Sequence, residues 1–249
     1  MTDGAGTGAA GTRFIGADLS GAVFRDVDLR RAKIVDALLD GAEVSGSITG
    51  LQVNGVEVAP LIEAELDRRH PERRALRATT PAGLRAGWAM VEEMWRPTMA
   101  RAERLTEADR QQRVDEEWSL TETLRHLVFV IDAWFGRAVR SDPHPYHPLG
   151  LPPSFLGDGA PMGINIDAPA SFADALGAHR ERMDAVAAYL RGVTDDELQA
   201  TRPGNSGTGY PPPTEHTVVG CLHVVMEEEW WHHQYAVRDL AVLTRLIER

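Results

Sequence analysis

Apolar residues recur at helical spacing in four long stretches of the chain beyond residue 80. A residue suited to cap a helix precedes three of them: Thr80, which is followed by proline, and Ser119 and Ser171, each with an acidic residue three positions later. The predicted helices cover about residues 80–104, 119–140, 171–191 and 214–249. Four helices of this length favour a mainly α, four-helix bundle, which we assign to residues 80–249.

The first of these helices shows its buried face most clearly. Leu84, Trp88, Val91 and Trp95 follow one another at spacings of three and four. Residues so spaced lie on one side of an α-helix, and an apolar side of this width packs against neighbouring helices. We therefore expect these four side chains in the core of the bundle.

A different period governs the N-terminal part of the chain. Every fifth residue is bulky and apolar, and the residue two positions before it is alanine or valine. The bulky positions are Leu19, Phe24, Leu29, Ile34, Leu39 and Val44. Neither the period of a helix nor that of a strand produces this spacing, whereas a four-sided coil with one pentapeptide per side does. We expect the apolar side chains inside this coil and the charged side chains outside.

This segment resembles the pentapeptide-repeat family, whose fold is a right-handed quadrilateral β-helix. We assign residues 13–58 to such a β-helix, and residues 1–12 to a disordered tail because they offer almost nothing to bury. Asn54-Gly55 between apolar residues predicts a β-hairpin that closes the coil. A charged, amphipathic stretch, residues 59–79, then predicts a linker helix.

Composition and charge narrow the classes of function. The formal net charge of −11 disfavours nucleic acid as a partner, because affinity for phosphate backbones depends on lysine and arginine. The single cysteine, Cys221, excludes an intrachain disulfide. The sequence shows neither a signal peptide nor an apolar run of about 18 residues. We therefore expect no membrane partner and a cytoplasmic location.

The fourth predicted helix carries ionisable residues on its apolar face. A buried carboxylate needs a cationic partner or a raised pKa. Glu229 and His233 lie one turn apart, which is the spacing that metal ligands on a helix use, and a Glu–His ion pair is the alternative. The apolar stripe that contains them runs Val219, Leu222, Met226, Glu229, His233, Ala236, Leu240 and Leu243.

A third candidate ligand, His126, lies in the second predicted helix. It precedes the apolar run 127–131, so we expect its ring to be buried. One backbone carbonyl can satisfy a buried neutral imidazole, and metal ligation is the alternative. The pair Glu228 and His232 repeats the Glu-x-x-x-His spacing one residue earlier, rotated by about 100°, and we place it beside the main stripe.

Several other residues with chemically capable side chains have plainer interpretations. On the fourth helix, the cysteine and the two tryptophans have positions suited to packing, whereas His223 and Glu227 fall on a more polar face that we expect to be solvated. Two histidines lie in the proline- and glycine-rich stretch 141–170, which is long enough to line a site. These residues are Cys221, His223, Glu227, Trp230, Trp231, His144 and His147.

The candidate ligands lie in two stretches, EWSLTETLRHLVFVIDAW and HVVMEEEWWHHQYAVRDL. Through them the chain resembles the DinB-like superfamily, and within it the mycothiol-dependent maleylpyruvate isomerase type, over residues 80–245. In that family a histidine of the second helix and an H/E-x-x-x-H pair of the fourth hold a divalent metal. The resemblance maps these ligands onto His126, Glu229 and His233, with zinc as the metal and nickel or iron as alternatives.

The resemblance also implies an activity. It suggests a metal-dependent S-transferase or isomerase that uses a small thiol of the mycothiol type against small electrophiles. Three protein ligands leave open positions on a metal, as in catalytic sites. Water at such a position gives a metal-dependent hydrolase instead, and a non-enzymatic metal-binding or stress-response module is the third alternative. The coil or exposed tryptophans offer a surface for a homodimer.

Overall fold

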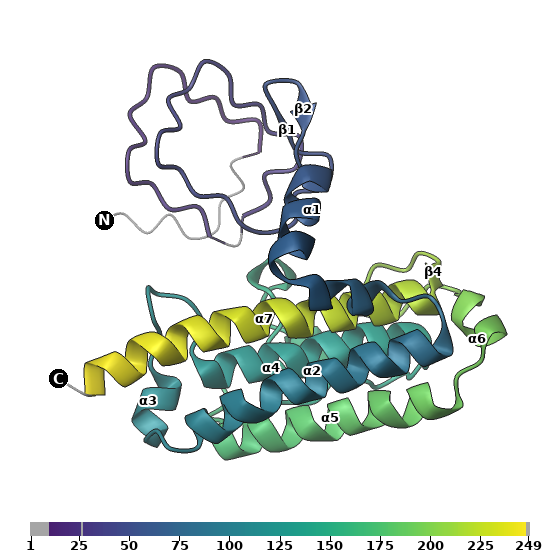
Figure 1. Ribbon diagram of the computed structural model, residues 1–249. Helices are drawn as coiled ribbons and strands as arrows, with labels where there is room; N and C mark the ends of the chain where they lie inside the picture. The colour runs from purple at the N-terminus through teal and green to yellow at the C-terminus, as the bar shows by residue number, and fades with distance from the viewer. Residues whose placement is uncertain (1–9, 26, 248–249) are drawn as a thin grey trace.

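The computed structural model describes residues 10–25 and 27–247. This part of the chain is mainly helical, with an angular coil followed by a bundle of long helices (Figure 1). The predicted mainly α architecture is confirmed. Most of the predicted disordered tail lies outside the described residues, and residues 10–12 form exposed backbone. The predicted domain boundaries remain predictions.

Residues 10–50 wind as an angular coil, and those of them that are described contain no β-strand (Figure 1). Among the described residues from 11 to 46, residues with positive φ lie at five-residue intervals, with residue 26 left out, and turn the chain at regular corners. Glycine adopts this conformation without a steric penalty, and it occupies most of the corners. The corners are Gly11, Gly16, Gly21, Arg31, Asp36, Gly41 and Gly46. The five-residue period of the sequence is thus also a period of the backbone.

The apolar side chains of the coil are exposed, which corrects the expectation that they fill its interior. Leu19, Phe24 and Leu29 are 46%, 57% and 52% exposed, and the later repeats behave alike. In repeat proteins each turn covers the apolar positions of its neighbours. A coil of so few turns lacks these neighbours, so its corners form without a packed interior.

A β-hairpin and a linker helix join the coil to the bundle, and both are predicted from the sequence. β1 (Gln52–Val53) pairs antiparallel with β2 (Val56–Glu57), and the Asn-Gly turn between them has positive φ at both residues. α1 (Ala59–Arg69) follows the hairpin. A 3₁₀ helix, η1 (Pro71–Arg77), then leads into the bundle.

Arg73 of η1 packs against the last helix of the bundle and so attaches the linker to it. Its side chain is 1% exposed, and its guanidinium lies 4.9 Å from the ring centre of Trp230 and 5.5 Å from that of Trp231. The same guanidinium pairs with Glu63 at 2.9 Å and with Asp67 at 3.3 Å. An arginine that is both stacked and paired fixes the direction of the group that carries it. The two tryptophans therefore serve packing.

Four long helices form the bundle, and the predicted start of three of them is confirmed. The side chains of Thr80, Ser119 and Ser171 each accept a hydrogen bond from the backbone N–H three residues on. The helices are α2 (Pro81–Ala102), α4 (Leu120–Ile131), α5 (Phe172–Gly192) and α7 (Val218–Ile247). Helix α4 packs against α5 and α7, and α2 packs against α7 and α5.

The core lies between these helices. Leu84, Trp88, Val91 and Trp95 of α2 are at most 3% exposed, as their spacing predicts. The stripe on α7 also faces the core, and from Leu222 onward no member is more than 9% exposed. Burial of a large apolar side chain stabilises the fold by about 1.5–3 kcal/mol. Among the described residues, no helix is long and apolar enough to cross a membrane.

The connections between the long helices contain only short elements. After α4 the chain continues directly into a π-helical segment, η2 (Asp132–Val139), which no sequence pattern indicates. The proline- and glycine-rich stretch that follows lies along α4 and includes two short 3₁₀ turns. The remaining elements are η3 (Ser154–Leu156), η4 (Ala160–Met162), α3 (Glu107–Gln111), α6 (Asp195–Gln199), and the paired strands β3 (Thr201–Arg202) and β4 (His216–Thr217).

Candidate metal centre

Helix α7 carries the spacing Glu-x-x-x-His twice, in registers one residue apart. We call Glu228 and His232 the outer pair, and Glu229 and His233 the inner pair. Successive residues of an α-helix are rotated by about 100°, so the two pairs meet different neighbours. The neighbouring side chains therefore determine which of the two pairs can bind a metal ion.

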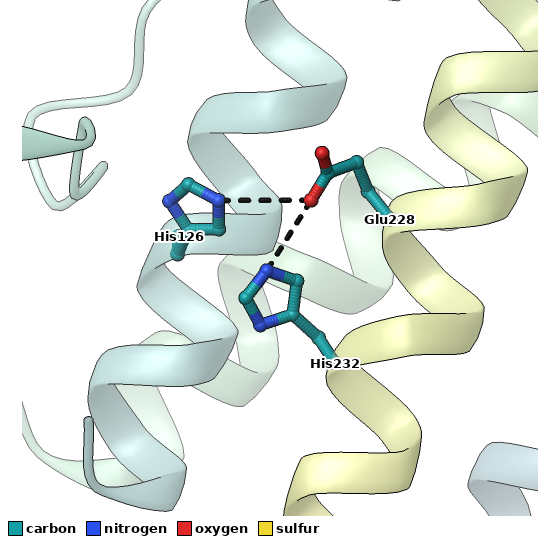
Figure 2. A group of neighbouring side chains, drawn as sticks. All are labelled: His126, Glu228 and His232. Carbon is teal, nitrogen blue, oxygen red and sulfur yellow. Dashed lines mark ion pairs between the residues drawn. The ribbon is translucent and has the colours of Figure 1, made fainter. Parts of the chain in front are cut away.

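The outer pair meets His126 of α4. Figure 2 shows the three side chains converging from the two helices. Nε2 of His232 lies 3.3 Å from Oε2 of Glu228, and Nε2 of His126 lies 3.9 Å from the same oxygen. One ligand atom of each residue lies within 4.8 Å of the other two, and no other group of three in the described chain meets this criterion. Two imidazole nitrogens and a carboxylate oxygen suit Zn²⁺ and related ions.

His126 is held in the orientation that a ligand needs. Its side chain is buried, and Nδ1 donates a hydrogen bond to the backbone carbonyl of Leu151 at 2.9 Å. Because a carbonyl can only accept, Nδ1 carries the hydrogen and Nε2 presents its lone pair toward Glu228. Burial and the nearby His232 lower the pKa of His126 to about 4. The ring is therefore neutral at physiological pH, which is the form that binds a metal.

Glu228 supplies the negative charge of the cluster. Burial acts to raise its pKa, but the hydrogen bond with His232 and the proximity of both histidines lower the pKa overall. The carboxylate is therefore ionised at neutral pH. Its side chain is 39% exposed, compared with 12% for His232 and 9% for His126, so Glu228 marks the open side of the cluster.

Aromatic rings surround the two histidines. The ring of Trp118 lies 4.5 Å from that of His126 and 6.1 Å from that of His232, measured between centres. Phe129 lies 6.3 Å from His126, and Tyr235 lies 5.6 Å from His232. Rings in these positions keep water from the sides of the cluster and strengthen electrostatic interactions within it.

The inner pair lies in the bundle core and has other partners. Glu229 is fully buried, and its Oε1 is 2.8 Å from Nε2 of His179 on α5. Nε2 of His233 is 2.8 Å from Oγ1 of Thr98 on α2. The His233 ring also packs edge-on against Trp95, with 5.0 Å between centres. Both members of the inner pair are thus engaged by helices other than α4.

The structure therefore does not bring together the predicted ligand set of His126, Glu229 and His233. The stripe correctly places Glu229 and His233 toward the core, but there they face α5 and α2. His126 instead lies on the side of α4 that faces the outer pair. Glu228 and His232, assigned from the sequence to a place beside the stripe, are the residues that meet it.

His179 is a partner that the sequence interpretation misses. It lies between Leu176 and Met183 of α5 at spacings of three and four, and all three side chains are buried. The reasoning that marks Glu229 as a core residue therefore also marks His179. Two ionisable residues on the core faces of different helices are natural partners for each other, and this signal was present in the sequence.

The remaining candidates occupy structural positions. Cys221 is 2% exposed, and burial raises the pKa of its thiol to about 11, so it is not a nucleophile at neutral pH. His223 is partly buried and forms a hydrogen bond with the carbonyl of Ala78 at 2.8 Å, which corrects its assignment to a solvated face. His144 is exposed and His147 is partly buried.

Comparisons with known proteins agree with this architecture. The family model described as the DinB superfamily matches residues 90–236, which is more than half of the chain and includes all three clustered residues. The model described as pentapeptide repeats matches residues 10–46 in eight copies, and so begins within the predicted tail. Neither a curated protein nor a solved structure matches the chain. The chain therefore belongs to the DinB superfamily and carries pentapeptide repeats ahead of its helical domain.

Proposed function

We propose that His126, Glu228 and His232 bind a divalent metal ion, with zinc as the first choice and nickel or iron as alternatives. The observation that carries this proposal is the convergence of their three ligand atoms within 4.8 Å of one another. The neutral ring of His126 and the ionised carboxylate of Glu228 both suit a cation. Two histidines and a carboxylate also suit non-haem iron, so the donor types alone do not choose the metal.

We propose further that the centre serves thiol chemistry on small electrophiles, either S-transfer or isomerisation, with a thiol of the mycothiol type as cosubstrate. Membership of the DinB superfamily supports this. So does the state of Cys221, the single cysteine of the chain, because its buried thiol cannot supply the nucleophile. A divalent ion held by these three residues would supply positive charge that lowers the pKa of a thiol bound beside them.

The protein's own groups have separate tasks in this scheme. His126 and His232 contribute neutral nitrogens, and Glu228 balances part of the charge of the ion. Three protein ligands leave room for one outside group. Trp118 and Phe129 beside the histidines restrict water, which favours attack by a thiolate over attack by water.

Metal analysis of protein prepared without a polyhistidine tag tests the centre. We expect about one equivalent per chain in the parent and in His233→Ala, and loss of the metal in His232→Ala. Glu228→Gln keeps the volume of the side chain but removes its charge, so it should weaken binding, whereas Glu229→Gln should not. Circular dichroism establishes that each variant is folded. Metal loss confined to His233→Ala would move the site to the inner pair, and a metal-free parent would overturn the proposal.

Turnover of a generic electrophile separates the thiol reaction from its alternatives. Consumption by the metal-loaded protein should require mycothiol and should cease in His232→Ala. Turnover without any thiol would favour a metal-dependent hydrolase. A metal-loaded protein that consumes no electrophile with any thiol would favour a non-enzymatic binding module.

We also propose that residues 13–58 form a right-handed quadrilateral β-helix, made by the winding of the coil and closed by the β1–β2 hairpin. The corners at five-residue intervals and the match to pentapeptide repeats support this winding. Amide hydrogen exchange tests it, because β-helical turns should protect backbone N–H groups with a five-residue period. Uniformly fast exchange over the segment would argue against a β-helix.

A further inference from the structure

The loop that enters α4, residues 112–118, places Trp118 against the candidate metal centre. The indole is tilted by 40° relative to the ring of His126 and lies nearly parallel to that of His232, at an angle of 21°. It therefore contacts both histidine ligands of the centre and covers one side of it. Trp118 itself is only half-buried, so it stands between the ligands and solvent.

The backbone of this loop is strained just before the tryptophan. Asp115 and Glu116 are consecutive and both left-handed, with φ of 49° and 61°. This conformation is unfavourable for residues other than glycine, and two in succession persist only where surrounding contacts hold them. The position of Trp118 thus depends on the contacts that anchor the loop.

Two arginines provide these anchors. Nη2 of Arg25, in the coil, donates to the backbone carbonyl of Asp115 at 3.1 Å, and this is the one side-chain hydrogen bond between the described parts of the coil and the bundle. On the other side, Arg238 of α7 binds the carboxylate of Glu117. Arg238 is itself held by Asp239 at 2.7 Å. The loop is therefore fixed from the coil and from the helix that carries the outer pair.

We propose that Trp118 controls the access of small ligands to the metal centre, and that Arg25 of the coil is a positioning residue that holds Trp118 over His126 and His232. The inference rests on the metal centre of the proposed function. It gives the pentapeptide segment a role in the site of the helical domain, since the coil stabilises the strained loop that carries the covering residue.

The rate at which a coloured chelator removes Zn²⁺ from the zinc-loaded full-length protein tests this role. Trp118→Ala should release the metal about tenfold faster or more, and Arg25→Ala several-fold faster, because loss of one solvent-exposed hydrogen bond changes a local opening equilibrium by about that factor. Trp118→Phe keeps an aromatic ring at this position, and Arg25→Lys keeps a positive charge. Both variants should therefore release Zn²⁺ at nearly the rate of the parent protein. Arg13→Ala is the matched control, because Arg13 is a coil arginine with no hydrogen bond or ion pair to the described residues.

A second measurement distinguishes easier access of small molecules to the metal from a change in the metal-ligating side chains. With Co²⁺ in place of Zn²⁺, the absorption spectrum should be the same in Arg25→Ala as in the parent, because Arg25 touches no ligand. An altered spectrum would count against a pure positioning role. Unchanged release rates in both Trp118→Ala and Arg25→Ala, with metal still bound, would overturn this inference and leave the metal centre intact. A parent that binds no metal would overturn both.

Discussion

His126 donates the hydrogen of Nδ1 to the backbone carbonyl of Leu151, and the bond of 2.9 Å ties a candidate metal ligand to the long loop after η2. The preceding residue, Arg125, donates to the carbonyls of three further loop residues. Two consecutive residues of α4 thus hold the loop through its backbone alone. The loop and the ligand orient each other, and the side chains of the loop remain free to vary.

Burial of His126, together with the nearby His232, predicts how its ring titrates in metal-free protein. The folded-state pKa of about 4 lies below the ordinary histidine value, so the unfolded chain takes up the proton first as the pH falls. The neutral ring of His126 should therefore contribute to the free energy of unfolding above about pH 6.5. This contribution, about 3 kcal/mol, should be lost as the pH falls from about 6.5 to about 4. Nitrogen NMR should show Nδ1 protonated and Nε2 bare. Denaturation at several pH values should show less acid sensitivity in His126→Gln, and a ring that titrates near pH 6.5 would contradict the assignment.

From the positions of the two pairs, we expect the inner pair to contribute to the stability of the fold and the outer pair to bind the metal. Glu229→Ala leaves His179 in the core without its partner, and we expect metal-free protein to lose about 3–5 kcal/mol of unfolding free energy. Glu228→Ala removes a partly exposed carboxylate and should cost about 1 kcal/mol or less while abolishing metal binding. Urea denaturation of both variants checks the contrast. Equal losses of stability would mean that the two pairs are not distinct.

Arg73 predicts how strongly the linker is attached to the bundle. Arg73→Ala removes a buried cation from between two indoles and two carboxylates, and should lower the unfolding free energy by about 2–4 kcal/mol. Lysine should not restore it, because an ammonium cannot stack and pair as a guanidinium does. Arg74→Ala is the matched control, since the neighbouring side chain is exposed. Thermal denaturation measures all three, and an unaffected Arg73→Ala would show that the linker is only loosely attached.

The burial of Cys221 predicts that its thiol is unreactive in the folded protein. Its thiol is buried with a raised pKa, so thiol reagents should leave the folded protein unmodified at neutral pH and modify one thiol per chain in denaturant. Cys221→Ser should retain any thiol-dependent activity, because the nucleophile comes from outside the chain. Rapid labelling of folded protein, or loss of activity in Cys221→Ser, would reopen a catalytic role for the cysteine.

The helices could be predicted from the sequence because their signals are local. Thr80, Ser119 and Ser171 satisfy backbone N–H groups within three residues, so no tertiary contact is needed to interpret them. The same holds for the Asn-Gly turn of the hairpin. The π-helical segment after α4 has no such local signature, and it was not predicted.

The cluster that we propose as the metal centre could be predicted from the sequence only to within one residue. An apolar stripe identifies the face of α7 that is buried, but a metal ligand must face its co-ligand, which lies on a particular neighbouring helix. His179 and Thr98 occupy the core beside Glu229 and His233, and that information resides in α5 and α2 rather than in α7. A rotation of about 100° separates the two interpretations, and only the packing of the bundle distinguishes them.

The spacing of the left-handed corners also limits how the length of the coil can change. An insertion or deletion of five residues adds or removes one side and leaves every remaining corner on the residue that occupies it now, which in most cases is glycine. Other changes of length shift the repeat, so that bulky side chains such as Leu19 or Phe24 can fall on a corner, where they would be strained. For a four-sided winding, a change of about twenty residues would also restore the direction in which the chain leaves the coil. Length variants in multiples of five should therefore be the ones that fold.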